Sequence, residues 1–256
     1  MVINQLKQYE VVIKIMEENG GYATLGYLYE NVLKFLERSG IHWKTKTPFA
    51  TIRRIVQDKR FFFRIKPGLW ALKTYRDKLP DDVILLVEKE TKPDADSIHT
   101  YYQGLLVEIG NIKGFKTYIP PQDKNKKFLG KRLRDIVGFE KMPNFTYNRI
   151  IQKVRTIDVI WFNEREFPAG AFEVNHTSDF QSSLFKFIEL QDFNVGFYIV
   201  SPKERYGEFK SKVESTAFNP IRNRIRFLTY DQIAKWHSKV YELMLTEKQI
   251  FKSTHV

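Results

Sequence analysis

Apolar residues recur at helical spacing in three successive segments at the start of the chain. The first is QLKQYEVVIKIMEENGG, which ends at two glycines where a left-handed backbone closes a helix at little cost. The second is TLGYLYENVLKFLERSG, with Thr24 as its expected N-cap and Gly40 as its end. The third, TPFATIRRIVQDK, is shorter and has Thr47 as N-cap and Pro48 in its first position. The pattern therefore predicts three helices.

A pair of short extended segments follows the helical patterns. RFFFRIKPGLWALK contains two runs rich in aromatic and branched residues, separated by Pro67 and Gly68, which favour a turn. Three helices and then a hairpin is the order of a winged helix, in which the third helix commonly enters the major groove of DNA. We therefore expect a winged-helix domain over residues 1–75. Because prolines and mixed charges follow, we expect a connector over 76–96 that holds one strand or helical turn.

Helical and extended patterns alternate in the rest of the chain, which we expect to form a second domain over residues 97–256. The helical segments include IHTYYQGLLVEIGNIKG, SDFQSSLFKFIELQDF and YGEFKSKVESTAF, and the extended ones include FKTYIPP, TIDVIWF, GAFEVN and VGFYIVSP. RIRFLTYDQIAKWHSKV adds a last strand and helix. This order predicts a mixed sheet flanked by helices, so we expect the fold class to be α/β (α+β).

Composition narrows the class of partner. A formal charge of +12 and an isoelectric point near 9.6 favour a polyanion, and we expect nucleic acid because no basic amphipathic helix suited to a membrane surface stands out. The absence of cysteine excludes disulfides, cysteine-bound zinc and thiol catalysis. The first residues carry no signal-peptide pattern and no apolar run reaches ~18 residues, so we expect a soluble cytoplasmic protein with no membrane partner.

Two acids sit at the ends of adjacent predicted strands. Asp158 begins one strand and Glu173 lies near the end of the next, so a hairpin would bring both carboxylates to one edge of a sheet. Two carboxylates suit Mg²⁺, which also keeps waters and binds phosphate, and the carbonyl of Val174 could face the same ion. The alternative is that both acids are ordinary surface residues, since this spacing also arises by chance. The histidines are scattered and no Walker loop is present, so we expect no zinc cluster and no nucleotide cofactor.

The first domain resembles a known DNA-binding family. ATLGYLYENVLKFLERSG, WKTKTPFATIRRIVQDKRFF and PGLWAL, within roughly residues 5 to 73, are similar to the HARE-HTH winged-helix family, which is found attached to chromatin proteins, RNA polymerase subunits and restriction enzymes and is proposed to read modified DNA. The residues expected to contact DNA surround the third helix and the wing tip, although charged residues of this kind also serve simply as a solvated surface. They are Lys44, Lys46, Thr47, Thr51, Arg53, Arg54, Lys59, Arg60 and Lys66.

The second domain resembles a nuclease superfamily. IDVIWFNEREFPAGAFEVNHTSDFQSSLFKFIELQDFNVGFYIV is similar to the PD-(D/E)xK nucleases, in the branch where His-Thr or His-Ser and a helix follow the catalytic strand. YYQGLLVEIGNIKGFKTYIPPQDKNKKF is similar to restriction endonucleases that carry this domain behind a winged helix. The resemblance covers most of residues 98 to 200 and implies that Asp158 and Glu173 are catalytic metal ligands. It further implies Glu108 as a third acid and sets Asn175 at the position of the usual catalytic lysine.

Asn175 departs from the superfamily pattern. The usual lysine orients or deprotonates the attacking water and offsets phosphate charge, which an amide cannot do as a cation or base. Asn175 could instead orient a metal-activated water through a hydrogen bond. Lys186, in the following helix, is a candidate cation from another element. His176 could contact the water or a phosphate, although we favour a role in packing or capping the helix.

QDKNKKFLGKRLRDIVG is the densest basic run of the second domain. Beside a nuclease site we expect it to contact phosphates, which strengthens binding without reading sequence, and a solvated helix face is the alternative. The residues concerned are Lys126, Lys127, Lys131 and Arg132. The aromatic residues expected in the core are Phe145, Tyr147, Trp161, Phe185 and Phe187.

These patterns and resemblances predict a Mg²⁺-dependent type II restriction endonuclease of the prokaryotic cytoplasm. Such an enzyme is a site-specific deoxyribonuclease acting on duplex DNA, and dependence on cytosine methylation is a further expectation. Because cutting both strands generally uses two sites, we expect a homodimer, at least on DNA. Two alternatives stay open: a catalytically silent DNA-binding reader or regulator with a degenerate nuclease domain, and an RNA-processing nuclease, since the fold alone does not choose the nucleic acid.

Overall fold

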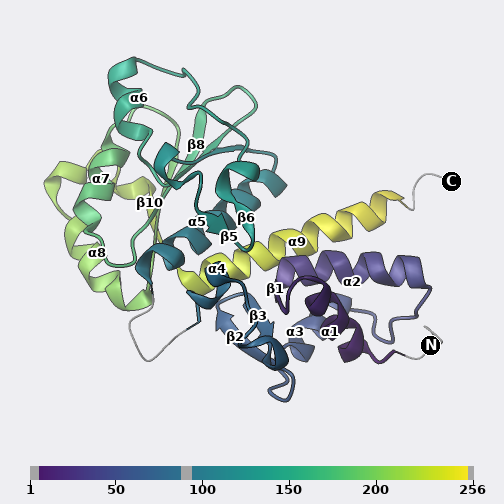
Figure 1. Cartoon of the computed structure of the whole chain (residues 1–256). Helices are drawn as coiled ribbons and strands as arrows, with labels where there is room; N and C mark the ends of the chain where they lie inside the picture. Colours follow the sequence, from purple (N-terminus) through teal and green to yellow (C-terminus); the bar gives the residue numbers. More distant parts are fainter. Residues whose placement is uncertain (1–5, 88–93, 253–256) are drawn as a thin grey trace. The chain divides into compact units, whose positions relative to one another are not determined.

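The chain divides into two compact units (Figure 1). The structure is a computed structural model and describes residues 6–87 and 94–252. The first unit takes in Met1–Lys92 and Ala234–Val256, and the second takes in Pro93–Ile233. The predicted division differs from this one, because it assigned the C-terminal segment to the second domain.

The first unit is built from helices and one small sheet. Its elements from the N-terminus are α1 (Gln8–Glu18), β1 (Tyr22–Thr24), α2 (Leu25–Ser39), α3 (Pro48–Ile55), β2 (Phe62–Lys66) and β3 (Leu69–Leu72). The predicted three helices and hairpin are therefore present, and Gly40 ends α2 in the left-handed conformation with φ 65°. The sequence pattern does not indicate β1, because its three residues are all buried and show no alternation. Strand β1 pairs antiparallel with β3 and completes a sheet of order β1-β3-β2.

The two predicted threonine caps differ in the structure. The hydroxyl of Thr24 accepts a hydrogen bond from the backbone N–H of Tyr27 at 3.2 Å, which confirms this cap. Thr47 occupies the N-cap position of α3, but its side chain makes no capping hydrogen bond. In the predicted connector, α4 (Asp81–Ile84) supplies a helical turn, and residues 88–93 lie outside the described residues.

A long C-terminal helix, α9 (Tyr230–Lys252), contributes all but its first turn to the first unit. Its Leu245 belongs to the buried core that α1, α2 and α3 form. Arg53 of α3 donates to the Glu242 carboxylate of α9 at 2.8 Å and to the hydroxyl of Tyr29 in α2 at 3.0 Å. These contacts explain why the C-terminal segment groups with the first unit. Neither α9 nor any other helix of the described residues has the length and apolarity to cross a membrane.

The second unit surrounds a five-stranded sheet. Its helices are α5 (Ala95–Ile112), α6 (Asn148–Val154), α7 (Phe180–Ile188) and α8 (Tyr206–Val213). Its strands are β4 (Lys116–Tyr118), β5 (Lys127–Phe128), β6 (Lys131–Arg132), β7 (Val159–Phe162), β8 (Pro168–Val174), β9 (Gly196–Ser201) and β10 (Ile225–Thr229). The predicted alternation of helices and strands is confirmed. Strands β5 and β6 form a separate hairpin within the basic run, which is therefore not the helix face considered as an alternative.

The five-stranded sheet has the order β10-β9-β8-β7-β4. Strands β4, β7 and β8 are antiparallel neighbours, whereas β8, β9 and β10 run parallel, so the sheet is mixed as predicted. The parallel strands are connected through α7 and α8, as parallel pairing requires. Helix α5 packs on β4, β7 and β8. Helices α6, α7 and α8 share a core with Ile160, Phe162 and Phe197 of the sheet.

The aromatic residues expected in the core fall into two groups. Three of them are buried or pack against the core, namely Phe145, Trp161 and Phe187. Tyr147 and Phe185 are 74% and 49% exposed, which corrects the prediction for these two residues. In α7 the buried residues follow the spacing i, i+3, i+4, i+7 from Phe180, and this spacing leaves Phe185 on the outer side.

Gly110 of α5 lies too close to the sheet to accommodate a side chain. A Cβ there would be 2.6 Å from both Thr117 Cγ2 and Trp161 Nε1. We predict that Gly110→Ala lowers the free energy of unfolding by about 1–3 kcal/mol, because overpacking outweighs the better helix propensity of alanine. Gly207→Ala in α8 is the matched control: nothing lies within 4 Å of its Cβ position, so we expect a gain in stability below about 1 kcal/mol. Guanidinium denaturation measures both, and an equally stable Gly110→Ala would contradict the close packing.

Candidate active site

Asp158 and Glu173 meet at the ends of two adjacent strands. Glu173 lies in β8, and Asp158 directly precedes β7. The antiparallel register pairs Val159 with Phe172, so its continuation by one residue sets Asp158 opposite Glu173. The hairpin that the strand pattern predicts therefore brings the two acids together.

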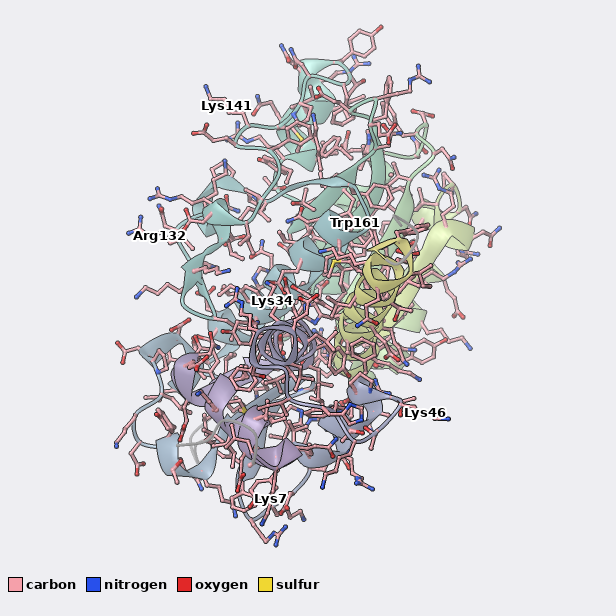
Figure 2. The ribbon with its side chains drawn as sticks, turned by 90° about the vertical axis from the view of Figure 1, so that its right-hand side faces the viewer. Lys7, Lys34, Lys46, Arg132, Lys141 and Trp161 are labelled. Carbon is pink, nitrogen blue, oxygen red and sulfur yellow. The ribbon has the colours of Figure 1, made fainter. Side chains whose placement is uncertain are left out.

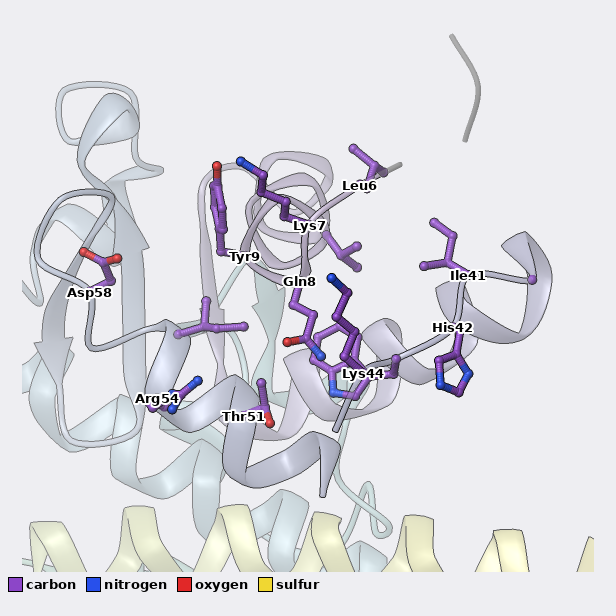
Figure 3. A pocket seen from close by; sticks show the side chains of 14 residues that line it. Leu6, Lys7, Gln8, Tyr9, Ile41, His42, Lys44, Thr51, Arg54 and Asp58 are labelled. Carbon is purple, nitrogen blue, oxygen red and sulfur yellow. The ribbon is translucent and has the colours of Figure 1, made fainter. Parts of the chain in front are cut away.

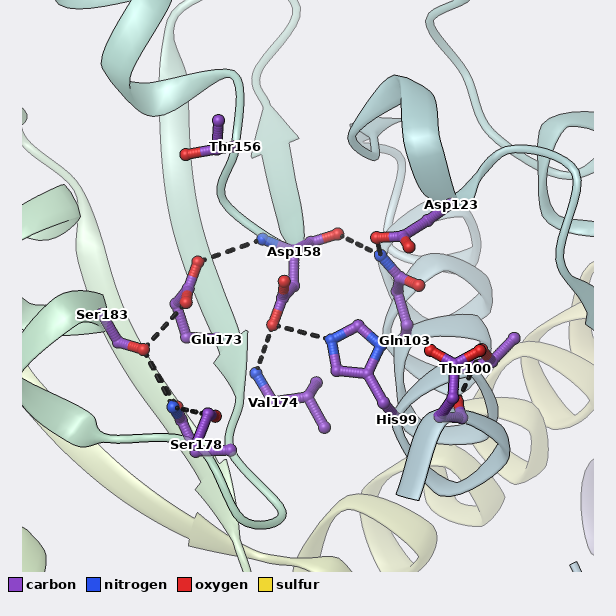
Figure 4. Close-up of polar contacts among 12 residues, drawn as sticks. His99, Thr100, Gln103, Asp123, Thr156, Asp158, Glu173, Val174, Ser178 and Ser183 are labelled. Carbon is purple, nitrogen blue, oxygen red and sulfur yellow. Dashed lines mark hydrogen bonds and ion pairs between the residues drawn. The ribbon is translucent and has the colours of Figure 1, made fainter. Parts of the chain in front are cut away.

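Reciprocal hydrogen bonds join the two strand ends (Figure 4). The backbone N–H of Asp158 donates to Glu173 Oε1 at 3.2 Å, and the backbone N–H of Val174 donates to Asp158 Oδ2 at 2.7 Å. Each carboxylate thus accepts from the strand that carries the other acid. The spacing of the two acids is consequently fixed by backbone groups, not only by flexible side chains.

Glu173 is buried and receives donors from α7. Ser183 Oγ donates to Glu173 Oε2 at 2.8 Å, and Lys186 Nζ lies 2.8 Å and 2.9 Å from the two carboxylate oxygens. Burial raises the pKa of Glu173 to about 7, the charge of Asp158 acts in the same direction, and Lys186 and Ser183 oppose the shift. These donors therefore offset only part of the cost of removing the carboxylate from water.

Asp158 is contacted from α5 by a histidine that the sequence pattern did not single out. His99 Nε2 lies 3.0 Å from Asp158 Oδ2. Burial by itself lowers the pKa of His99, but the hydrogen bond and charge of Asp158 outweigh burial, so the pKa is raised. A lone histidine in a helical segment carries no spacing signal, and only the packing of α5 on the sheet reveals this contact.

A second buried acid lies behind Asp158. Gln103 Nε2 donates to the backbone carbonyl of Asp158 at 2.7 Å and to Asp123 Oδ2 at 3.1 Å. Lys126 Nζ lies 2.8 Å from Asp123 Oδ1 and also pairs with Asp96. These contacts hold α5 against the strand end. Lys126, one of the residues predicted to contact DNA, already pairs with two carboxylates.

The amide of Asn175 is buried and forms hydrogen bonds with two serines. Its Nδ2 donates to Ser178 Oγ and to Ser183 Oγ, each at 2.9 Å. Ser183 Oγ lies 2.8 Å from Glu173 Oε2 and 3.2 Å from Asn175 Oδ1. Because a serine hydroxyl has a single hydrogen, it donates to the nearer acceptor, Glu173. Asn175 therefore links the strand end to α7 and helps to hold the hydroxyl that contacts Glu173.

A cation approaches the two acids from α7 and not from β8. Lys186 Nζ contacts Glu173 and also donates to the backbone carbonyl of Thr156 at 3.0 Å. Lys186 follows Ser183 by three positions, so both side chains leave the helix on the same face. The sequence identifies Lys186 only as a candidate from another element, whereas the structure shows its ammonium on Glu173.

Glu108 lies farther along α5 than the residues that contact Asp158. It is nine positions after His99, which corresponds to about 13.5 Å along the helix axis and about half a turn around it. His99 and Gln103 of α5 both contact Asp158. Helix geometry therefore favours His99 over Glu108 as the residue that α5 contributes to the site.

The strand ends offer oxygen ligands that suit a divalent ion. Asp158 and Glu173 supply carboxylates, and Val174 directs its N–H to Asp158, so its carbonyl faces the same neighbouring strand. The raised pKa of Glu173 means that a nearby positive charge is favourable there. Within residues 6–87 and 94–252, no group of three or more His, Asp or Glu side chains is arranged to hold a metal; Mg²⁺ requires only one or two carboxylates.

An arginine that the sequence pattern did not indicate fixes the loop after β8. Arg205 donates at 2.9–3.2 Å to three backbone carbonyls, those of Asn175, His176 and Ser178. His176 Nδ1 lies 3.1 Å from the hydroxyl of Tyr230, at the start of α9. The loop that follows Glu173 is therefore held from two sides.

The residues predicted to contact DNA differ in how accessible they are. Thr51 and Lys66 are buried, and Arg53 pairs with Glu242 at 2.8 Å. The exposed residues of this set are Lys44, Lys46, Thr47, Arg54, Lys59 and Arg60 in the first unit, and Lys127, Lys131 and Arg132 in the second. Figure 2 shows Lys46 and Arg132 projecting from their units. The burial of Lys66 corrects its expected place at an exposed wing tip.

Two known sequences match this chain. The sequence model of the family described as "Type II restriction enzyme NmeDI C-terminal domain" matches residues 79–253, which include all the residues around Asp158 and Glu173 described above. The type II restriction enzyme NmeDI of Neisseria meningitidis serogroup C is 25% identical over 170 residues, which cover 61% of this chain and 47% of that protein. The chain therefore spans about half the length of this curated relative. No solved structure matches the chain.

The raised pKa of Glu173 predicts a pH-dependent stability. Its ordinary value of 4.5 applies to the unfolded chain and about 7 to the folded one, so the folded state binds the proton more tightly. Stability from this group is present below about pH 4.5 and is lost as pH rises through about 7. Without metal, the free energy of unfolding should therefore fall between about pH 5 and 8 relative to Glu173→Gln, as measured by denaturant unfolding at each pH. Parallel curves for the two proteins would disprove the shift.

Proposed function

The chain belongs to the family of the type II restriction enzyme NmeDI C-terminal domain, and on that premise we propose that it is a Mg²⁺-dependent endonuclease that cuts duplex DNA at a specific site. The observation that carries the proposal is the pairing of Asp158 and Glu173 through reciprocal backbone hydrogen bonds, with the ammonium of Lys186 on the same carboxylate. Two acids and a cation at one strand end are the groups that phosphodiester hydrolysis needs. The mixed five-stranded sheet, in which β7 and β8 are antiparallel neighbours, supports the proposal because it brings the two acids to one edge.

We assign the metal to the oxygens of Asp158 and Glu173 and to the carbonyl of Val174. When bound, Mg²⁺ lowers the pKa of a water molecule and neutralises charge on the phosphate. The protein's own contribution is to hold the two carboxylates at a fixed spacing through backbone N–H groups. His99 orients Asp158 from the side of α5, as a hydrogen-bonding residue behind a metal ligand commonly does.

Lys186 supplies the positive charge that the superfamily pattern places on a lysine at position 175. Its ammonium is within 2.9 Å of both oxygens of Glu173, close enough to orient a water beside the metal ligands and to offset phosphate charge. Asn175 is then a positioning residue: it holds Ser183, and Ser183 holds Glu173.

The first unit serves as a winged helix that binds DNA, and its exposed residues around α3 contact phosphates. These are Lys44, Lys46, Thr47, Arg54, Lys59 and Arg60. The exposed cations of the β5–β6 hairpin, Lys127, Lys131 and Arg132, act on phosphates near the cut. Cutting both strands then requires two copies of the chain. We further propose that cleavage depends on methylation of cytosine in the recognition site.

The rival function is a catalytically silent DNA reader, and the amide at position 175 is the observation that favours it. Such a protein would keep the fold and the basic surface while losing turnover. It differs from the nuclease in one measurable respect, because it retards DNA in a gel without cutting it.

Incubation with Mg²⁺ and plasmid DNA separates these functions. We expect discrete fragments from plasmid that is either unmodified or methylated at cytosine, and no fragments with Asp158→Ala, since loss of a ligand removes the metal. Intact but retarded plasmid in both methylation states would support the silent reader. RNA cleavage with intact plasmid would instead identify an RNA-processing nuclease. The Asp158→Ala protein must unfold at a denaturant concentration close to that of the parent for the comparison to hold.

The proposed role of Lys186 makes a separate prediction. Lys186→Met should lower the cleavage rate by about 10²–10³-fold, the scale for losing one preorganised donor at a reacting centre. Lys186→Arg should recover part of the rate because it keeps the charge. Lys210→Met in α8, an exposed lysine paired with Glu214, is the matched control and should cut like the parent.

Duplex binding without metal distinguishes catalysis from recognition in these variants. All three lysine variants should bind DNA within about threefold of the parent, since one phosphate contact at most is altered. Cleavage by Lys186→Met at the parental rate would remove Lys186 from the mechanism.

A further inference from the structure

A cavity of about 910 Å³ opens in the first unit, outside the region that matches the NmeDI family (Figure 3). The start of α1, the loop after α2 and one face of α3 form its walls. Three exposed cations line it, namely Lys7, Lys44 and Arg54. The acid in the wall, Asp58, is held by Arg60 with an oxygen-to-nitrogen distance of 2.7 Å, so its charge is already compensated. The cavity therefore presents a positive field to an incoming molecule.

The wall also contains two buried N–H groups that lack an acceptor. Gln8 Nε2 and Trp43 Nε1 have no hydrogen-bond partner among the residues that the structure describes. Buried donors are nearly always paired, so two in one wall call for a ligand that supplies acceptors. Figure 3 shows the amide of Gln8 beside the side chain of Lys44, which is exposed and long enough to swing aside. Its movement gives an incoming acceptor access to the amide of Gln8.

We propose that this cavity binds a single nucleotide. The phosphate meets Lys44 and Arg54, and acceptor atoms on the base edge take the N–H groups of Gln8 and Trp43. Tyr9 and Trp43 in the wall are aromatic side chains that suit a planar base. The volume lies within the range of small-molecule sites. The absence of a Walker loop argues against an ATP-type cofactor, and this wall of helix and loop residues does not require one.

The nucleotide has two sources with the same chemistry: a free deoxynucleoside monophosphate, or a nucleotide displaced from duplex DNA. Lys44 and Arg54 are also among the residues proposed to contact DNA, so the second source rests on the proposed DNA-binding function of the first unit. Displacing a base from a duplex costs unstacking energy, which hydrogen bonds and ion pairs with the donors and cations of the cavity offset.

Calorimetric titration in EDTA tests the first source. The four deoxynucleoside monophosphates and inorganic phosphate are titrated into the full chain and into Trp43→Phe and Lys44→Gln. We expect at least one nucleotide to bind about tenfold more tightly than phosphate, and each variant to weaken it by about tenfold, as loss of one hydrogen bond to a charged or buried group predicts. Lys34→Gln, on α2 and paired with Glu30, is the matched control and should bind like the parent.

A duplex that carries 2-aminopurine tests the second source, because the fluorescence of this base rises when it leaves the stack. A rise on binding to the parent and to Lys34→Gln, and its loss in Trp43→Phe and Lys44→Gln, supports capture from DNA.

The proposal is overturned if inorganic phosphate binds as tightly as every nucleotide and the fluorescence does not rise, which would indicate an anion site only. It is equally overturned if neither titration nor fluorescence responds, or if both variants behave like the parent. Neither assay depends on cleavage, so a failure of the endonuclease proposal leaves both results interpretable. If the chain binds no duplex at all, the free nucleotides still decide the matter.

Discussion

The buried carboxylate of Glu173 is the group on which the arrangement of the second unit depends. It is 3% exposed, and burial and the charge of Asp158 both oppose its ionisation. A buried charge without partners costs several kcal/mol, so α7 must remain against β8 for Ser183 and Lys186 to reach it. The same requirement explains why α7 follows β8 as a crossover helix: the parallel strand β9 needs that connection, and the acid needs the donors on it.

The amide at position 175 follows from this arrangement. Asn175 is buried next to Ser178 and Ser183, and a lysine there would bring a second ammonium towards a carboxylate that Lys186 already contacts. A lysine ammonium would lose its hydration there, and the groups nearest to the side chain, Ser178 and Ser183, supply only hydroxyl oxygens. An uncharged residue that can donate to two hydroxyls is the better neighbour once the cation comes from the helix.

Much of the fold could be predicted from the sequence because its elements have regular patterns. Helical spacing and glycine or threonine caps identify α1, α2 and α5, and the hairpin between β7 and β8 brings Asp158 and Glu173 together by register alone. The contacts of His99, Lys186 and Arg205 could not be predicted, because each joins elements whose packing the local pattern does not encode.

The helical phase of α5 decides which of its side chains reaches Asp158. Glu108 is an acid in that helix, but the side chain at the strand end is decided by the helical phase relative to the sheet, which places His99 there. In the same way, hydrophobicity alone puts Phe185 in the core, whereas the phase of α7 turns it outward. Which side of a helix faces the sheet can be determined only once the surface it packs against is known.

The family match covers the second unit but only part of the first. The matched segment runs from 79 to 253 and so contains both acids, Lys186 and the whole of α9. Helix α9 packs into the first unit through Glu242 and Leu245, although α1, α2 and α3 lie before the match begins. The match therefore does not extend to Gln8, Trp43 and Lys44. The cavity between α1 and α3 is therefore a property to be tested in this chain itself, independently of how its relatives cut DNA.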